Sequence, residues 1–235
     1  MDPVYLSDSY AKECAAKVVE MPEPKKAVLD INLFYPRGGG QPSDRGSLFS
    51  ASGSAFRVLN VEKKEGKIVH ELDREGLKAG DSVNCTLDWK RRHALMRMHT
   101  AAHILAGMFS LETGALITGN QLEEDKSRFD FSLGNFDRAK FDEIVQKANE
   151  KIAQNIELKI YSLPREEAMK IPGIVKLANA LPPGISVLRI VEIPGADVQA
   201  DGGTHVKNTS EIGKIELLKL ENKGAANKRI YFVLK

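Results

Sequence analysis

The hydrophobic pattern of this chain changes its period near Trp89, and this change limits the folds open to it. Before Trp89, short runs rich in β-branched residues alternate with glycine, proline and aspartate breakers. Three such runs are FRVLNVEKK (56–64), KIVHELD (67–73) and SVNCTLDW (82–89). Runs of this kind predict strands. No long stretch with the periodicity of a helix occurs among them. We therefore expect a small antiparallel β-barrel over residues 1–89.

After Trp89 the apolar residues recur at steps of three and four, which predicts helices with one face toward a core. The first stripe consists of Leu95, Met98, Ala102, Leu105 and Phe109. The second stripe consists of Phe141, Ile144, Val145, Ala148 and Ile152. We expect Asn135 or Asp137 to cap the second helix, because both side chains accept hydrogen bonds from a first helical turn.

Further strands are predicted in the second half of the chain. Their runs are ELKIYSL (157–163), SVLRIVEI (186–193), KIELLKL (214–220) and RIYFVLK (229–235). The stretch ENKGAANK (221–228) between the last two is typical of a hairpin loop. The expected class is α+β, with the barrel followed by an α+β domain over residues 90–235 whose helices pack on a mostly antiparallel sheet. The boundary should lie near residues 88–92.

Composition excludes several classes of protein. With 235 residues and 42% hydrophobic side chains, the chain can form one large folded domain or two of ordinary size. Its net charge of +2 is too small to indicate nucleic-acid binding by charge alone, so an RNA contact would need local patches. Two cysteines, no run of the roughly 18 apolar residues that span a membrane, and no signal-peptide pattern predict a cytoplasmic protein with reduced thiols.

Three histidines and one aspartate have the spacing of a metal site. His99 and His103 are one helical turn apart at the margin of the first apolar stripe. His205 ends the segment DGGTH, which begins at Asp201 and lies between predicted strands, hence in a loop at a sheet end. Three imidazoles and a carboxylate suit zinc. Taken separately, the histidine pair also fits core-edge histidines, and the Asp-Gly-Gly segment fits an ordinary turn.

These motifs resemble the editing domain of alanyl-tRNA synthetase and its free-standing relatives, the AlaX-type trans-editing proteins. HTAAH (99–103) and DGGTHVKNTSEIG (201–213) are similar to the two halves of the family's metal site. FYPRGGGQPSDRG (34–46) is similar to its glycine-rich motif, and ENKGAANKRIYF (221–232) to its closing segment. The resemblance covers nearly the whole chain in the expected order, and the length is similar to the medium form of these proteins.

The resemblance implies a hydrolase that removes a wrong amino acid, chiefly serine and in some members glycine, from tRNA(Ala). It implies one zinc ion per chain, bound by His99, His103 and His205. Neither DNA nor a membrane is an expected partner, and the oligomeric state is left open. The residues expected to bind the aminoacyl group are Thr100, Gln41, Asn32, Gly202, Gly203 and Thr204. The residues expected to contact tRNA are Gly38, Gly39, Gly40, Arg91 and Arg92.

Two positions differ from the family's pattern. Asp201 stands where the family usually has cysteine, so it either binds zinc directly or holds a histidine or a water beside it. We favour the second arrangement, because three histidines already make a site with an open position. Asn32 stands where medium-form relatives often have a threonine associated with discrimination between serine and glycine. The choice of amino acid is therefore less determined than the reaction.

Two other functions are compatible with parts of the pattern. The missing cysteine leaves open a non-catalytic tRNA-binding module. A zinc peptidase is disfavoured, because HTAAH lacks the glutamate that metalloproteases carry directly after the first histidine.

Overall fold

The computed structural model describes residues 3–134, 137–174 and 184–235. The chain divides into two compact units, Met1–Leu95 and Met96–Lys235, and the boundary between them falls inside helix α2 (Trp89–Thr113). The domain ranges expected from the sequence, 1–89 and 90–235, stay predictions.

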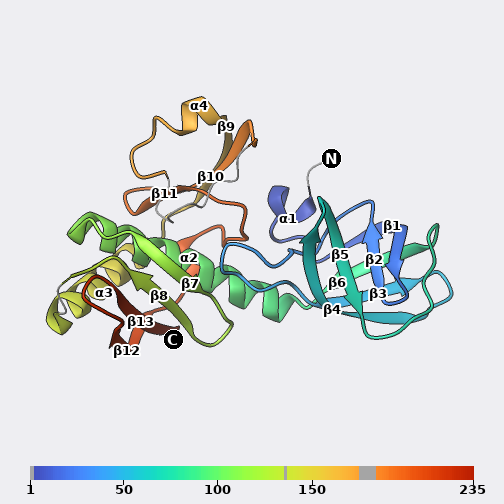
Figure 1. The fold of residues 1–235 in the computed structure, drawn as a ribbon, viewed down its shortest axis with the longest axis horizontal. Helices are drawn as coiled ribbons and strands as arrows, with labels where there is room; N and C mark the ends of the chain where they lie inside the picture. The colour runs from blue at the N-terminus through green and yellow to red at the C-terminus, as the bar shows by residue number, and fades with distance from the viewer. Residues whose placement is uncertain (1–2, 135–136, 175–183) are drawn as a thin grey trace. The chain divides into compact units, whose positions relative to one another are not determined.

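The first unit is a closed barrel in which all neighbouring strands are antiparallel (Figure 1). After the short helix α1 (Val4–Ser7), its strands are β1 (Glu13–Glu23), β2 (Lys26–Leu29), β3 (Gly46–Ser50), β4 (Ala55–Lys64), β5 (Lys67–Leu72) and β6 (Ser82–Leu87). The strand order is β1-β2-β5-β4-β3-β6, and pairing of β6 with β1 closes it. Alternate residues such as Val18, Leu48 and Cys85 point inward and are fully buried. The predicted small antiparallel barrel is confirmed.

The described part of the second unit contains two antiparallel sheets where the sequence predicted one. The larger has the order β12-β13-β8-β7, and the smaller has the order β11-β10-β9. Their strands are β7 (Ile117–Gln121), β8 (Ser127–Phe131), β9 (Lys159–Pro164), β10 (Val187–Ile193), β11 (Asp197–Ala200), β12 (Ile215–Asn222) and β13 (Lys228–Leu234). Four of these, β9, β10, β12 and β13, match predicted runs, and the predicted hairpin joins β12 to β13. The α+β class is confirmed.

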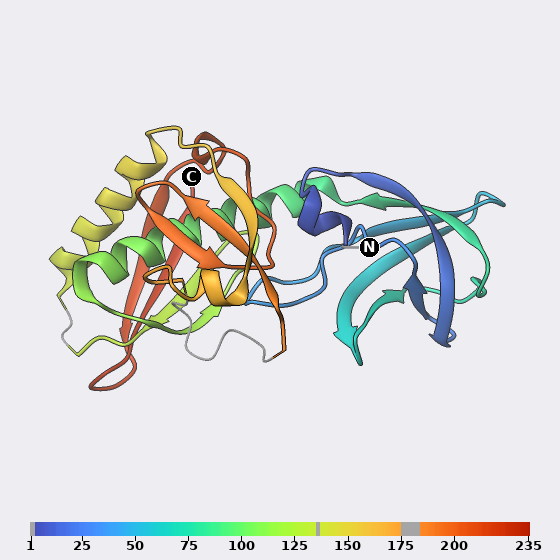
Figure 2. The ribbon, with the colours of Figure 1, turned by 90° about the horizontal axis from the view of Figure 1, so that it is seen from above.

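Helix α3 (Arg138–Ile152) packs on the larger sheet beside α2 (Figure 2). Asp137 caps it by accepting hydrogen bonds from the first helical turn, as predicted, whereas the alternative cap Asn135 lies outside the described residues. The whole predicted stripe of α3 is buried. Asn149 bonds both backbone groups of Ile215 on β12, and Lys147 forms an ion pair with Glu112 of α2.

Within the second unit, helix α2 is buried on more than the predicted stripe. In addition to that stripe, the apolar residues at most 3% exposed are Met96, Ala101, Ile104, Ala106 and Met108. A helix that is apolar on all sides lies inside a core. His99 and His103 therefore project from a central helix and not from a surface helix.

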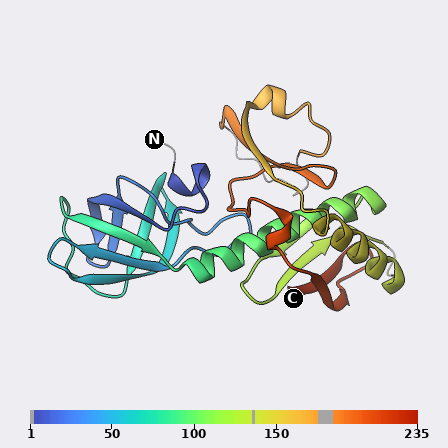
Figure 3. The same ribbon diagram turned by 180° about the vertical axis from the view of Figure 1, so that it is seen from behind.

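The smaller sheet has a core of its own beneath helix α4 (Arg165–Ala168) (Figure 3). Its buried side chains include Ala168, Leu188 and Ile190. Strand β11 pairs with β10 and ends at Ala200, so the chain leaves this sheet directly into the DGGTH segment. The 3-10 helix η1 (Thr209–Glu211) follows this segment.

Among the described residues, no helix combines the length and the apolar character needed to cross a membrane.

Candidate metal centre

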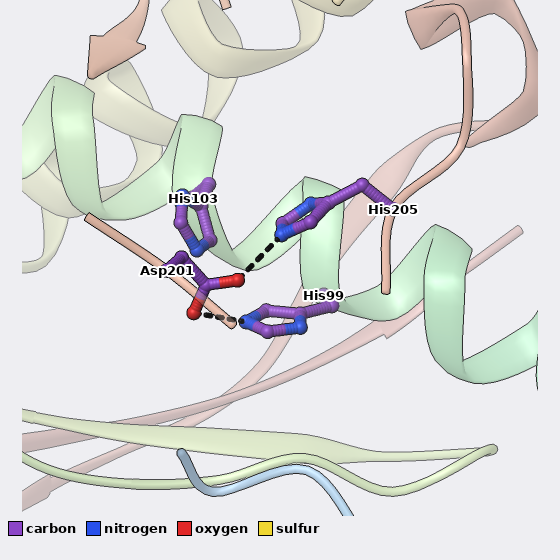
Figure 4. A group of neighbouring side chains, drawn as sticks. All are labelled: His99, His103, Asp201 and His205. Carbon is purple, nitrogen blue, oxygen red and sulfur yellow. Dashed lines mark hydrogen bonds and ion pairs between the residues drawn. The ribbon is translucent and has the colours of Figure 1, made fainter. Parts of the chain in front are cut away.

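Four side chains of the second unit converge at one point (Figure 4). His99 and His103 project from α2, and Asp201 and His205 come from the segment after β11. Each offers one ligand atom, and these atoms all lie within 4.8 Å of one another. The three histidines are between 1% and 6% exposed. The structure thus brings together the two halves that the sequence placed about one hundred residues apart.

The carboxylate of Asp201 lies between two imidazoles. Its Oδ2 is 3.0 Å from Nε2 of His205, and its Oδ1 is 3.8 Å from Nε2 of His99. Oδ2 also accepts a hydrogen bond of 2.6 Å from the backbone N–H of Gly203. This bond spans two residues and closes an Asx turn. The ordinary turn considered for Asp-Gly-Gly is therefore present, and it aims the carboxylate at the histidines.

Thr100 orients His205. The Thr100 hydroxyl donates to the carbonyl of Met96 at 2.9 Å, so toward its other neighbours it acts as an acceptor. Those neighbours are the N–H of Val206 at 3.2 Å and Nδ1 of His205 at 3.1 Å. This network assigns the His205 proton to Nδ1 and leaves Nε2 bare toward Asp201. Thr100, expected to line the substrate pocket, is fully buried with its hydroxyl engaged by the protein.

His103 is oriented by Asp197, which the sequence did not single out. Nδ1 of His103 lies 2.9 Å from Oδ2 of Asp197, and the amide of Gln199 donates to the same oxygen at 2.8 Å. A carboxylate that holds the outer nitrogen of a histidine, so that the other nitrogen faces a metal, is common in metal sites. No sequence spacing reveals this pair, because 94 positions separate the two residues.

The DGG segment is fixed in place by close packing and by Arg189. A Cβ atom on Gly203 would overlap the imidazole of His99, whereas a Cβ on Gly202 would meet nothing within 4 Å. Nη1 of Arg189 on β10 donates to the carbonyls of Asp201 at 2.9 Å and Gly203 at 3.1 Å. Sequence reasoning missed Arg189, because one arginine within a strand run has no distinguishing pattern.

Burial sets the protonation states of the cluster. It lowers the pKa of His99 well below its usual value and the pKa of His205 to about 4. Burial alone would raise the pKa of Asp201, but the neighbouring His99 opposes this, and the pKa lies well below its usual range. At neutral pH the cluster therefore presents imidazole lone pairs and a carboxylate, which are the forms that bind metal ions.

The donor set fits a metal cation. A bare Nε2 of His205 at 3.0 Å from a carboxylate oxygen of Asp201 brings two lone pairs together, which a cation between them stabilises. The outer nitrogens of His103 and His205 are already held by Asp197 and Thr100. Nitrogen and oxygen donors of this kind suit zinc among the common metal ions.

The glycine-rich motif of the first unit is a defined turn. Gly39 and Gly40 have φ values of 58° and 86°, and reciprocal backbone hydrogen bonds join Gly38 to Gln41. Two central residues with positive φ make a type I′ turn, which favours glycine. The Tyr35 hydroxyl donates to the carbonyl of Gly38 at 2.9 Å. Gln41 is fully buried, and the roles expected for these residues toward tRNA and substrate stay predictions.

Arg92 does not present a surface charge. Its guanidinium is fully buried and bonds the Asp44 carboxylate through Nε at 3.0 Å and Nη2 at 2.5 Å. It also donates to the carbonyls of Ser9 at 2.8 Å and Leu33 at 2.9 Å. The sequence placed Arg92 among the basic residues at the start of the first predicted helix that were expected to contact tRNA. The guanidinium thus has partners within the barrel, and the tRNA contact expected of Arg92 stays a prediction.

Arg91 and Asn32 also lie in the first unit. The Arg91 guanidinium donates to the carbonyl of Ser43 at 3.0 Å and is 8% exposed, so little of it faces solvent. Asn32 is half-buried, and its Oδ1 has no hydrogen-bond partner among residues 3–134, 137–174 and 184–235. The tRNA contact of Arg91 and the substrate contact of Asn32 remain predictions.

Comparison with known proteins identifies the family. The family model for the threonyl and alanyl tRNA synthetase second additional domain matches residues 188–231, and the model for class II (A) tRNA synthetases matches residues 7–91. The alanyl-tRNA editing protein AlaX-M of Saccharolobus solfataricus is 49% identical, over 100% of this chain and 99% of its own length. The chain belongs to the AlaX-M family of alanyl-tRNA editing proteins. The resemblance seen in the sequence is confirmed.

Other relatives agree with this assignment. AlaX-M of Methanosarcina barkeri is 48% identical over 99% of this chain and 98% of its own length. The alanine-tRNA ligase of Pyrococcus abyssi is 37% identical over 97% of this chain but only 25% of its own length. This chain thus corresponds to a quarter of that ligase. The half-site at residues 99–103 lies between the two ranges matched by family models.

Proposed function

We propose that this chain hydrolyses the ester bond between tRNA(Ala) and a wrongly attached amino acid, chiefly serine, with glycine as a second substrate. Its membership of the AlaX-M family makes it an aminoacyl-tRNA hydrolase with tRNA as partner. The observation that carries the proposal is the convergence of His99, His103, Asp201 and His205 in a chain that matches AlaX-M over its full length.

The same group supports one zinc ion per chain as cofactor. His99, His103 and His205 would supply nitrogen ligands, and Asp201 an oxygen. When bound, zinc polarises a carbonyl oxygen or lowers the pKa of a bound water, and either effect assists ester hydrolysis. We propose Asp201 as a direct ligand, in place of the supporting role that the sequence favoured. One of its carboxylate oxygens and one nitrogen of each histidine all lie within 4.8 Å of one another.

The protein's own side chains keep this group ready for the metal. Thr100 and Asp197 hold the outer nitrogens of His205 and His103, and Arg189 anchors the backbone of the loop that carries Asp201. Such pre-set geometry lets a site act without reorganisation during the reaction. Because the Thr100 hydroxyl is engaged by the protein, we do not assign it to recognition of the serine hydroxyl.

The deciding experiment compares hydrolysis of seryl-, glycyl- and alanyl-tRNA(Ala) by the purified full chain. We expect seryl-tRNA(Ala) to be hydrolysed and alanyl-tRNA(Ala) to be spared, by up to roughly 10⁴-fold if the pocket bonds the serine hydroxyl. Equal rates on the two substrates would contradict the proposed specificity. Binding of tRNA by metal-loaded protein without hydrolysis of any ester would instead favour a non-catalytic binding module.

Metal analysis of variants tests the ligand set. Protein never exposed to chelators should contain about one zinc per chain. His103→Ala and Asp201→Ala should each empty the site, and Asp201→Cys should retain the metal and much of the activity, because it restores the family's usual residue. If Asp201→Ala keeps its zinc while His103→Ala loses it, Asp201 is not a ligand and acts beside the metal.

A further inference from the structure

The seam that closes the barrel carries both cysteines of the chain. Cys14 on β1 lies directly opposite Cys85 on β6, within a run of pairs that continues without a register shift from Glu13↔Thr86 to Lys17↔Ser82. Directly opposed residues of antiparallel strands point to the same face of a sheet. Here that face is the barrel interior, where Cys85 is fully buried and Cys14 is half-buried.

The spacing of this pair suits a covalent link. Opposed Cα atoms in antiparallel strands are about 4.5 to 5.5 Å apart. A disulfide accepts Cα separations of about 4.4 to 6.8 Å, so this pair requires no large movement of the backbone. Both side chains contribute to the barrel core from the same register position, so they are direct neighbours across the seam.

The two sulfurs have different reactivity. Interaction with the neighbouring Cys85 lowers the pKa of Cys14, whereas interaction with Cys14 and burial raise the pKa of Cys85. The carboxylate of Asp30 opposes ionisation of both thiols but does not reverse the difference. The thiolate is the nucleophile in thiol chemistry. The half-exposed Cys14 is therefore the attacking sulfur, and the buried Cys85 is its resolving partner.

We propose that Cys14 and Cys85 form a reversible disulfide that joins the first strand of the barrel to its last, with a peroxide as oxidant. The Cys14 thiolate attacks one oxygen of hydrogen peroxide, the O–O bond breaks, hydroxide leaves and Cys14 becomes a sulfenic acid. The Cys85 sulfur then attacks the Cys14 sulfur, the S–S bond forms, and the sulfenic OH leaves as water with the Cys85 proton. Two thiols are oxidised by two electrons in total, and one peroxide is reduced.

The link encloses β1 to β6 in one covalent loop. In the reduced protein, β1 and β6 are held together by backbone hydrogen bonds and side-chain packing. A cross-link that closes a long loop stabilises a fold mainly by restricting the unfolded chain. The oxidised protein should therefore unfold at a higher urea concentration than the reduced protein, and dithiothreitol should reverse the difference.

The test uses the full chain, reduced with dithiothreitol, desalted and then treated with a small excess of hydrogen peroxide. Under denaturing, non-reducing conditions the mass should fall by two hydrogens, both free thiols should disappear, and one protease fragment should contain Cys14 linked to Cys85. Retention of both thiols would overturn the proposal. So would Cys14 sulfinic acid without a link, or dimers joined between chains.

Matched variants separate the link from general oxidation. In Cys14→Ala and Cys85→Ala, peroxide should leave the urea midpoint unchanged, whereas in the unmodified chain it should raise the midpoint. An equal rise of the urea midpoint in either variant would contradict stabilisation by the Cys14–Cys85 disulfide. If Cys85→Ala does not fold, Cys14→Ala and the fragment analysis of the unmodified chain still decide the question.

Discussion

The barrel and the second unit each bury a cluster of charged and polar side chains, but the two clusters are built in opposite ways. In the barrel, Arg92 directs its guanidinium at the Asp44 carboxylate and at two backbone carbonyls, so acceptors of the barrel surround the buried cation. In the second unit, His205 and Asp201 direct bare acceptor atoms at each other, while Thr100 holds the outer nitrogen of the imidazole.

This difference teaches how to separate structural polar clusters from functional ones. Burial does not separate them, since Arg92 and His205 are 0% and 1% exposed. What separates them is whether donors face acceptors. A cluster in which they do is complete in itself, whereas one in which acceptors converge is completed by a cation. The following predictions test this distinction, from the largest expected effect to the smallest.

The largest effect on the metal site is expected for Gly203→Ala. Its methyl group would overlap the His99 imidazole, so either the ring or the loop must move. We expect zinc affinity to fall by roughly 100-fold or more, beyond the range of residues that only orient a ligand. Gly202→Ala is the matched control, because its methyl group enters open space. Competition with a chromophoric chelator measures both, and equal affinities for the two variants would contradict the packing argument.

In the barrel, Arg92→Leu should lower stability without acting on the metal site. It leaves the Asp44 carboxylate buried without its partner, which costs about 3 to 5 kcal/mol of unfolding free energy. The double variant Arg92→Leu/Asp44→Leu should recover much of this loss, because no charge then remains buried. Urea unfolding measures the effect. A loss below about 1 kcal/mol, as for a surface ion pair, would show that Arg92 is not the structural cation described here.

His70 provides a pH-dependent contrast with the metal-site histidines. It lies in the barrel with Nδ1 at 3.2 Å from the carbonyl of Ala27, and burial lowers its pKa to about 4. In the unfolded chain the pKa is about 6.5, so between these values the unfolded state binds more protons. The contribution of neutral, buried His70 to the free energy of unfolding is thus complete above about pH 6.5. It is lost as the pH falls toward 4, and the total loss is about 3 kcal/mol.

The test for His70 is His70→Phe, which keeps an aromatic ring beside Phe34. Urea unfolding at pH 7 and at pH 4.5 should show a smaller loss of stability on acidification in the variant than in the unmodified chain. The difference between the two losses should be about 2 to 3 kcal/mol. Parallel pH profiles would mean that His70 is protonated or exposed in the folded barrel.

The sequence predicted those parts of the fold whose cause is local. The change of hydrophobic period at Trp89 indicated the barrel and the α+β half, and β-branched runs indicated strands such as β10. Strand β11 was missed, because Asp197–Ala200 is four residues long and owes its conformation to pairing with β10. The full burial of α2 was also missed, because an amphipathic stripe shows one buried face and tertiary packing supplies the others.

The same limit applies to the site. The four-residue spacing of His99 and His103 on a helix, and of Asp201 and His205 in a loop, marked the four converging residues. Asp197 was not marked, because its position beside His103 depends on where β11 lies in the folded unit. The burial of Arg92 was not predicted, for a complementary reason. A charge is expected at the surface unless a buried partner is known, and Asp44 is 48 residues away.

The smallest effect is expected at Asp197, because it acts on the metal through His103 alone. Asp197→Ala removes the acceptor 2.9 Å from Nδ1 of His103, so the ring is free to rotate and to change tautomer. We expect zinc affinity to fall about 10-fold, the lower end of the range for residues that orient a ligand, with the metal still bound at saturating zinc.

Asp197→Asn should retain most of the affinity, because its amide oxygen accepts the same bond. Gln199→Ala should change the affinity least, because the Gln199 amide bonds the Asp197 carboxylate and acts on His103 only indirectly. Zinc binding should be weakest in Asp197→Ala, tighter in Asp197→Asn and tightest in Gln199→Ala. This order would support orientation of His103 through a hydrogen bond. An Asp197→Ala site that binds zinc as tightly as the unmodified chain would show that packing of α2 alone holds His103.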